Sequence, residues 1–316
     1  MTQAPDSKLA HLPISFFTVP MGVFGLSLAL AAGGLRTASL LIGGLGCLVL
    51  AVLFIALALK AARHPAALKA EWSHPIKLAF FPATSIAVLL MATFLLDLSP
   101  QVARPIWLVG AAAQGVLTLI VISAWISHRA FGPGQLSPAW FIPAVGNLMA
   151  PLGGQALGYP GLSWYFFAVG LLFWIVLLTL VFNRLIFHDP LPGKLQPTIV
   201  ILIAPPALAF LGWVGFNGGA IDPAAYLFIS LGYFFAALVA LQLPALLKLP
   251  FALSFWALSF PLAALTVASF RFAALADSAL HQGIGYVLLA GLTLAIAVLA
   301  VRTTRAAISG ALFQPD

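Results

Sequence analysis

Residues able to catalyse a reaction or bind a metal are few and scattered in this sequence. Its histidines are His11, His64, His74, His128, His188 and His281, and none forms a complete metal-ligand set with a second His, a Cys or a carboxylate. Glu71 and His74 come nearest, and we interpret this pair as contacts at the start of a helix. No Gly-rich loop followed by Lys and Ser or Thr is present to hold a phosphate. We therefore predict no catalytic residue, no metal site and no cofactor.

Proline, in contrast, recurs at a spacing with structural consequences. Intervals of 62, 61, 62 and 56 residues separate Pro20, Pro82, Pro143, Pro205 and Pro261. A fixed period of this length indicates an internal repeat. Proline lacks the N–H that bonds the carbonyl four residues earlier, so a helix containing one should bend there. The carbonyls affected are those of Phe16, Leu78, Ala139, Ile201 and Ala257.

The composition identifies the elements that carry these prolines. Hydrophobic residues make up 63% of the 316 residues and charged residues only 7%, whereas a soluble domain carries about 25% charged residues. Most of the surface must therefore face lipid. A bilayer is crossed by helices of roughly 20 apolar residues or by alternating barrel strands. The long apolar runs here do not alternate, so we predict an all-α membrane protein.

Dividing the chain at charges and loop residues gives ten transmembrane helices arranged as five hairpins. Their predicted ranges are 15–32, 38–61, 75–97, 104–127, 138–157, 161–187, 197–216, 223–247, 250–272 and 281–301. Each odd helix contains one of the periodic prolines, and each even helix lacks one in its middle. Freed carbonyls need protein or a water-filled cavity around them. We therefore expect the kinked odd helices to line a central pore around a pseudo-fivefold axis, with the even helices outside. The alternative is that these prolines only shape helix packing.

The basic residues predict the orientation. Connections from odd to even helices carry Arg36, Arg104 and Arg271. The termini and the other connections carry Lys8, Lys60, Arg63, Lys69, Lys77, Arg129, Arg184, Lys194, Lys248, Arg302 and Arg305. By the positive-inside rule both termini are cytoplasmic in an inner (plasma) membrane. The predicted organisation is a cytoplasmic segment 1–14, a channel domain 15–301 and a cytoplasmic segment 302–316. The net charge of +7 follows this topology and does not indicate nucleic-acid binding.

No Asp, Glu, Lys or Arg lies in the middle of a predicted span. Proton-coupled carriers and cation channels usually need such groups, so neither is favoured. The basic residues would concentrate anions at the cytoplasmic mouth, and Lys77 is a candidate for that position. Aromatic residues beside the prolines are further candidates for the pore wall, or else bulk that faces lipid: Phe17, Phe81, Phe141 and Phe260.

Three short stretches resemble one known family. They are Glu71–Lys77 (EWSHPIK) leading into Phe80-Phe81-Pro82, then Val145-Gly146-Asn147, and then Phe255–Pro261 (FWALSFP). In order and position these stretches are similar to the third, fifth and ninth helices of the bacterial tellurite-resistance protein (TehA) and plant guard-cell slow anion channel family. The resemblance covers essentially the whole chain.

The resemblance implies an anion channel, a pore lined by the kinked odd helices, and a homotrimer. It also implies a phenylalanine on the ninth helix that occludes the pore, which by position is Phe260, and it makes Asn147 a further pore candidate. Pro261 follows the occluding residue as in the plant channels, where TehA has glycine. The family also includes proteins assigned to dicarboxylate and sulfite transport, so the resemblance does not identify the anion.

Two functions from different classes follow. The first is a gated channel for small monovalent anions such as chloride or nitrate, with Phe260 as the plug. The second is a secondary carrier for a C4-dicarboxylate, sulfite or tellurite. A dicarboxylate carrier would need paired cationic or strong donor groups near the midplane, and the sequence offers none. A third hypothesis, from another class, is a membrane enzyme or a structural helix bundle. No clustered polar residues support an enzyme, and a structural bundle would not need five periodic prolines.

Overall fold

The computed structural model describes residues 8–127 and 131–313, and within them the chain forms helices and no strand. Nine helical stretches in these ranges are long and apolar enough to cross a membrane. The predicted all-α membrane class is therefore confirmed. Residues 1–7 and 314–316 of the predicted terminal segments, with His128 and Arg129, lie outside the described residues.

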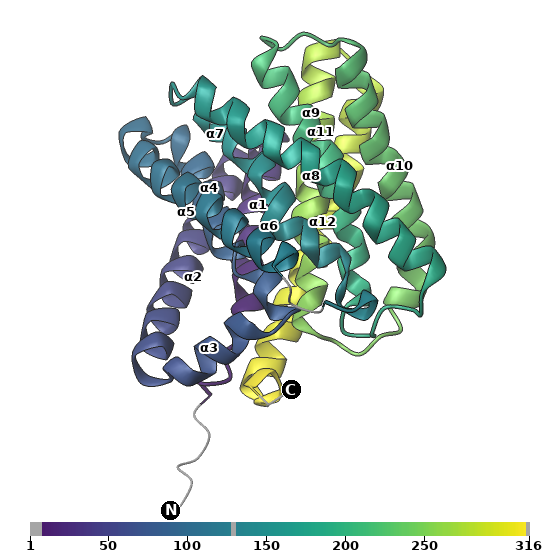
Figure 1. Cartoon of the computed structure of the whole chain (residues 1–316). Coiled ribbons are helices and arrows are strands. Elements are labelled where there is room, and N and C mark those ends of the chain that lie inside the picture. The colour runs from purple at the N-terminus through teal and green to yellow at the C-terminus, as the bar shows by residue number, and fades with distance from the viewer. Residues whose placement is uncertain (1–7, 128–130, 314–316) are drawn as a thin grey trace, which may run out of the picture.

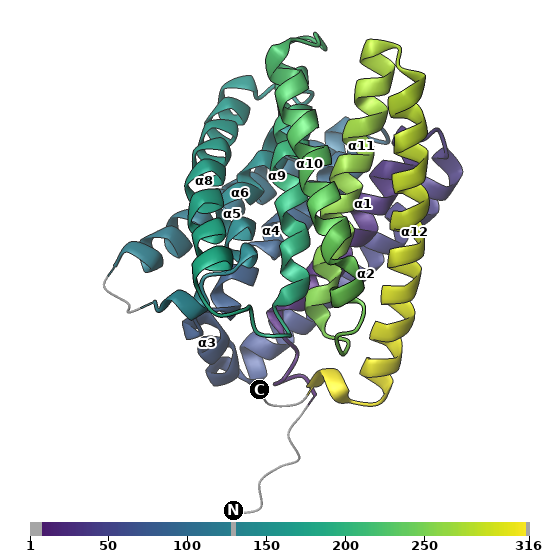
Figure 2. The same cartoon turned by 90° about the vertical axis from the view of Figure 1, so that its right-hand side faces the viewer.

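Five long α-helices form the outer layer. We call them the outer helices: α2 (Arg36–Arg63), α5 (Pro100–Ile126), α8 (Pro160–Phe187), α10 (Pro223–Leu246) and α12 (Ala279–Ile308). Only 22–33% of the residues in their most apolar stretches are buried. Figure 2 shows α8, α10 and α12 running in a common direction. Large exposed side chains, such as Leu41, Ile175 and Leu241, give them a surface suited to lipid.

Five segments with a different construction lie between the outer helices, and we call them the inner spans. Each begins with a 3₁₀-helix and continues as an α-helix. Four are η1–α1 (Ile14–Phe17, Thr18–Ala32), η2–α4 (Lys77–Phe80, Ala83–Leu96), η6–α9 (Gln196–Ile203, Ala204–Phe216) and η7–α11 (Leu253–Leu258, Ser259–Ala276). In these four, 72% of the residues in the most apolar stretch are buried.

The remaining inner span is broken into four short helices. They are η4 (Pro138–Trp140), α6 (Phe141–Val145), η5 (Gly146–Met149) and α7 (Ala150–Gly154). This segment corresponds to the predicted helix 138–157, but none of its pieces alone is long enough to cross a membrane.

The periodic prolines mark the change from 3₁₀- to α-helix. Pro20, Pro143 and Pro261 are the third residues of their α-helices, Pro205 is a second residue, and Pro82 is an N-cap. The first N–H groups of an α-helix have no intrahelical acceptor, so proline there loses no hydrogen bond. We expected a continuous α-helix kinked at each proline; the structure instead starts a new α-helix there.

The 3₁₀-helices also supply donors for carbonyls that we expected proline to free. The carbonyl of Leu78 accepts a hydrogen bond from Phe81 N at 3.3 Å, and that of Ile201 accepts one from Ala204 N. The i to i+3 pattern of a 3₁₀-helix uses the donor that precedes the proline ring. These two backbone groups are therefore satisfied without a water-filled cavity.

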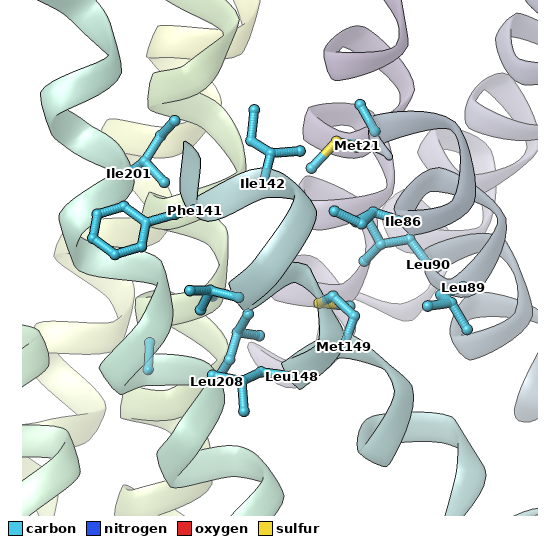
Figure 3. Close-up of a cluster of buried hydrophobic side chains, with 14 of the residues drawn as sticks. Met21, Ile86, Leu89, Leu90, Phe141, Ile142, Leu148, Met149, Ile201 and Leu208 are labelled. Carbon is cyan, nitrogen blue, oxygen red and sulfur yellow. The ribbon is translucent and has the colours of Figure 1, made fainter. Parts of the chain in front are cut away.

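The inner spans contact one another in a closed cycle at two levels. The α-helical halves meet in the order α1, α4, α7, α9, α11 and back to α1, and the 3₁₀ halves in the order η1, η2, η4, η6, η7 and back to η1. Each inner span also packs against the outer helix that follows it. Figure 3 shows apolar side chains from several inner spans meeting in the core, among them Met21, Ile86, Met149 and Leu208.

One short helix departs from this plan. Helix α3 (Pro65–Ser73) follows α2 directly and precedes the second inner span. Figure 1 shows it crosswise at the end of the molecule where α12 finishes. Because every inner span begins with its 3₁₀ half, we call this the 3₁₀ end.

Candidate functional site: an apolar cavity between the inner spans

A small cavity lies where all the inner spans converge. Its volume is about 30 Å³. Every inner span contributes to its wall, with these residues in chain order: Gly25, Leu28, Leu90, Met149, Leu152, Leu208, Leu211, Phe260, Ala263, Ala264 and Val267. A water molecule needs roughly 10–15 Å³ and two or more polar partners to be held in a cavity. The space is thus narrow and offers side chains that do not hydrogen-bond.

Phe260 enters this cavity from the start of α11. It is the second residue of the helix, directly after the change from η7 and directly before Pro261. Its side chain is half-buried and lines the cavity with Ala263 and Val267 of the same helix. Gly25 of α1 faces it, since a Cβ added at Gly25 would lie 3.7 Å from Phe260 Cδ2. The ring of Phe260 is thus the one aromatic side chain among the residues that line this cavity.

The other aromatic candidates lie elsewhere. The ring of Phe17 is 5.1 Å from Phe54 of α2, and the ring of Phe81 is 4.6 Å from Trp72 of α3. Phe141 is 1% exposed and points toward the segment that carries Ile201 (Figure 3). The structure brings none of these rings to the cavity wall, so Phe260 differs from its counterparts in the other repeats.

Asn147 belongs to a buried polar network between the broken inner span and α5. Its Nδ2 donates to Ala144 O at 2.6 Å and to Thr118 Oγ1 at 3.0 Å. Thr118 Oγ1 donates to Pro143 O at 2.8 Å, and Gln114 Nε2 donates to the same carbonyl at 3.1 Å. Ser85 Oγ donates to Gln114 Oε1 at 2.7 Å. Unpaired carbonyls are costly in a lipid environment, and this network satisfies two of them where the span is broken.

Charged residues are distributed around the ends of the spans rather than in the cavity. Lys77 is the first residue of η2, so it lies at the 3₁₀ end. Arg184 lies in the last turn of α8, and Lys194 and Lys248 lie in the connections before η6 and η7, so all three are also at the 3₁₀ end. Arg36 and Arg104 lie at or near the start of outer helices, at the opposite end. The 3₁₀ end is therefore the more positive of the two.

Sequence reasoning missed a buried ion pair at the 3₁₀ end. Lys60 Nζ lies 2.6 Å from Glu71 Oε2, with the side chains 2% and 9% exposed. Lys60 also donates to Leu12 O at 2.8 Å, and Glu71 Oε1 accepts from Ile14 N at 3.2 Å. Nearby, His74 Nδ1 accepts from Ile76 N and Lys77 N. His74 thus makes the expected contact at the start of a helix, whereas Glu71 pairs with Lys60 and accepts from the first inner span. Within the described residues, no group of three or more His, Cys, Asp or Glu could hold a metal.

Glu71 is the chain's only glutamate and is close in sequence to several lysines, and this signal could have indicated the ion pair.

The long apolar helices define an integral membrane protein of the α-helical class, and its candidate site is a small apolar cavity. The chain belongs to the SLAC1 family of voltage-dependent anion channels, because the family's sequence model matches residues 11–304.

Relatives from plants, archaea and bacteria agree with this assignment. The chain is 28% identical to the S-type anion channel SLAH3 of Arabidopsis thaliana over 245 residues, which are 75% of this chain and 38% of SLAH3. It is 25% identical to the uncharacterized transporter MJ0576 of Methanocaldococcus jannaschii over 269 residues, which are 78% of this chain and 77% of that protein. It is 23% identical to the tellurite resistance protein TehA homolog of Haemophilus influenzae over 265 residues, which are 82% of this chain and 80% of that protein. The match to the plant channel thus spans well under half of that protein.

Proposed function

We propose that this protein is a gated channel that passes small monovalent anions, such as chloride or nitrate, along the axis of the inner spans. In the closed state the ring of Phe260 fills the constriction. Pro20, Pro82, Pro143, Pro205 and Pro261 shape the path because each starts an α-helix at the same level of the repeat. The ten spans then form five hairpins around a pseudo-fivefold axis.

The observation that carries this proposal is the position of the cavity. Its wall takes residues from every inner span, and the side chain with the greatest reach among them is Phe260. Hydrophobic constrictions gate channels by excluding water from the pore. Rotation of one ring, or a small shift of the start of α11, would widen such a constriction without breaking a polar contact of that ring.

The chemistry of the wall favours weak binding of the ion. No charged side chain lines the cavity, and a conducting pore needs a site that an ion can leave. The basic residues at the 3₁₀ end raise the local anion concentration there. With that end cytoplasmic, both chain termini are cytoplasmic in an inner membrane. A homotrimer, as the family resemblance implies, gives each protomer its own pore.

The test is anion current through the wild-type protein and the Phe260→Ala variant in planar bilayers, with chloride and then nitrate as the permeant ion. We expect little current from the wild type and a large, ohmic, anion-selective current from the variant. Phe81→Ala is the matched control, because it removes the same ring from another repeat where the ring contacts Trp72. Its current should stay close to that of the wild type.

The carrier hypothesis predicts a different result. Saturable uptake of a labelled dicarboxylate or of sulfite into liposomes, with no current from any variant, would reject the channel and favour the carrier. Equal currents from Phe260→Ala and Phe81→Ala would retain a pore but reject Phe260 as its plug.

A further inference from the structure

The junction that holds Phe260 is joined by one side-chain hydrogen bond to an outer helix. Trp256, in η7, is 2% exposed, and its Nε1 donates to Thr303 Oγ1 of α12 at 2.8 Å. Thr303 lies near the end of α12 (Ala279–Ile308), between the exposed residues Arg302 and Thr304. The contact therefore reaches from the core of the protein to the 3₁₀ end of its outer layer.

Trp256 is in turn bonded to the residue that precedes Phe260. The carbonyl of Trp256 accepts the backbone N–H of Ser259 and, at 2.6 Å, the Ser259 hydroxyl. Ser259 is the first residue of α11 and Phe260 is the second. The position of the Trp256 backbone thus determines where α11 starts and the direction from which Phe260 enters the cavity.

Helix α1 closes the other side of this junction. A Cβ added at Gly22 would lie 2.2 Å from Ser259 Oγ and 3.1 Å from Trp256 Cε3. Ser259 and Trp256 therefore already touch the α1 backbone and cannot move further in that direction. The bond to Thr303 is a polar contact that opposes movement away from α1, beside the apolar packing of Trp256 against α12.

We propose that Thr303 is a positioning residue for Phe260: its hydroxyl holds Trp256, and through it the start of α11, in the closed arrangement. This inference rests on the proposed function, in which Phe260 is the plug. If Thr303 has this role, a change at the membrane surface that moves the end of α12 controls conduction. Displacement of that end would release Trp256 and favour the open state.

The first experiment compares currents from Thr303→Val and Thr303→Ser in the wild-type background. Valine keeps the shape of threonine but removes the acceptor, so we expect current to rise about threefold to tenfold, the effect of losing one net hydrogen bond on a two-state equilibrium. Serine keeps the hydroxyl that accepts from Trp256, so Thr303→Ser should give the wild-type current. Thr304→Val is the matched control at the neighbouring exposed position and should change nothing.

The second experiment repeats Thr303→Val in the Phe260→Ala background. With the plug removed, the substitution should add nothing, whereas general damage to the helix would change both backgrounds alike. The proposal is overturned if Phe260→Ala conducts and Thr303→Val leaves the wild-type current unchanged, or raises both backgrounds equally.

Amide hydrogen exchange gives a readout that does not depend on conduction. Thr303→Val should speed exchange in the segment 259–262, and Thr304→Val should not. If Phe260→Ala fails to conduct, the proposed function fails, and the gating role of Thr303 fails with it. In that case, faster exchange would still show that Thr303 restrains the start of α11. Unchanged exchange would show that Thr303 does not restrain it.

Discussion

The inner spans and the outer helices have similar apolar composition but opposite constructions. The outer helices are continuous α-helices of 24–30 residues, whereas each inner span changes from 3₁₀ to α at a proline. In their most apolar stretches, 22–33% of the residues of the outer helices are buried, against 72% in the four inner spans other than the broken one. Irregular backbone is tolerated in a membrane only where protein surrounds it. The comparison shows that burial is what permits the breaks.

Apolar packing and polar contacts both join the two layers. The buried ion pair of Lys60 and Glu71 ties α2 and α3 to the start of the first inner span, and breaking it should have the largest effect. Lys60→Met keeps the aliphatic part of the side chain but leaves Glu71 buried without its cation. Removal of one partner of a buried ion pair costs about 3–5 kcal/mol. We expect the free energy of unfolding in detergent micelles to fall by that amount in a denaturant titration.

Two comparisons make this prediction specific. The double variant Lys60→Met/Glu71→Gln should recover a large part of the loss, because no unpaired charge remains and the amide can still accept from Ile14 N. Lys69→Met removes an exposed lysine from α3 and should be nearly neutral. A loss for Lys60→Met no greater than that for Lys69→Met would show that the pair does not stabilise the attachment of α2 and α3 to the first inner span.

The sequence predicts the all-helical membrane class well, but not this ion pair. The proline period identifies the inner spans because a missing N–H is a local property of the residue. In the sequence, however, Lys60 is not distinguishable from the other basic residues of the predicted cytoplasmic connections. Its partner is reached only because α3 forms and turns Glu71 back toward the start of the first inner span. Contacts that depend on the folding of a separate short element are invisible to residue spacing.

The 3₁₀ halves and the place of Asn147 were unpredictable for related reasons. Proline shows that an α-helical bond is absent, but not whether the chain before it remains α-helical or tightens into a 3₁₀-helix. Asn147 is polar in an apolar span, which fits a pore wall as well as a packing network. In the structure Asn147 belongs to a packing network because α5 places Gln114 and Thr118 opposite its segment. Phe260 and its counterparts all lie beside prolines in the sequence, and their tertiary positions place Phe260 alone among them in the cavity wall.

The different tolerance of the two layers for proline can be measured directly. Ile175 lies in the middle of α8 and is 60% exposed, so its side chain contributes little packing. Ile175→Pro removes an intrahelical hydrogen bond and should destabilise the protein by about 3 kcal/mol or more. Pro205→Ala in the first turn of α9 should cost about 1 kcal/mol, since no hydrogen bond changes there.

Thermal unfolding in detergent would rank these variants, with Ile175→Ala as the control for loss of the side chain. Similar losses for Ile175→Pro and Pro205→Ala would contradict the view that the inner prolines mark helix starts. In that case the prolines would act by the shape of their rings alone.

A smaller effect than that of Ile175→Pro is expected at the network that supports the broken inner span. Gln114 is fully buried on α5 and bonds both Ser85 and the carbonyl of Pro143. Gln114→Leu keeps most of the volume but removes one hydrogen-bond partner from each of these groups, while Thr118 still donates to Pro143 O and Ser85 to Pro82 O. Loss of these hydrogen bonds should cost about 1–3 kcal/mol. Hydrogen exchange should rise in the segment 143–149, because its backbone is short of intrahelical bonds and depends on α5. Thr179→Val is the control, since the Thr179 hydroxyl donates to Ile175 O of its own outer helix. If both variants leave the exchange of that segment unchanged, the break is held by packing alone, and the difference between the layers does not require polar support.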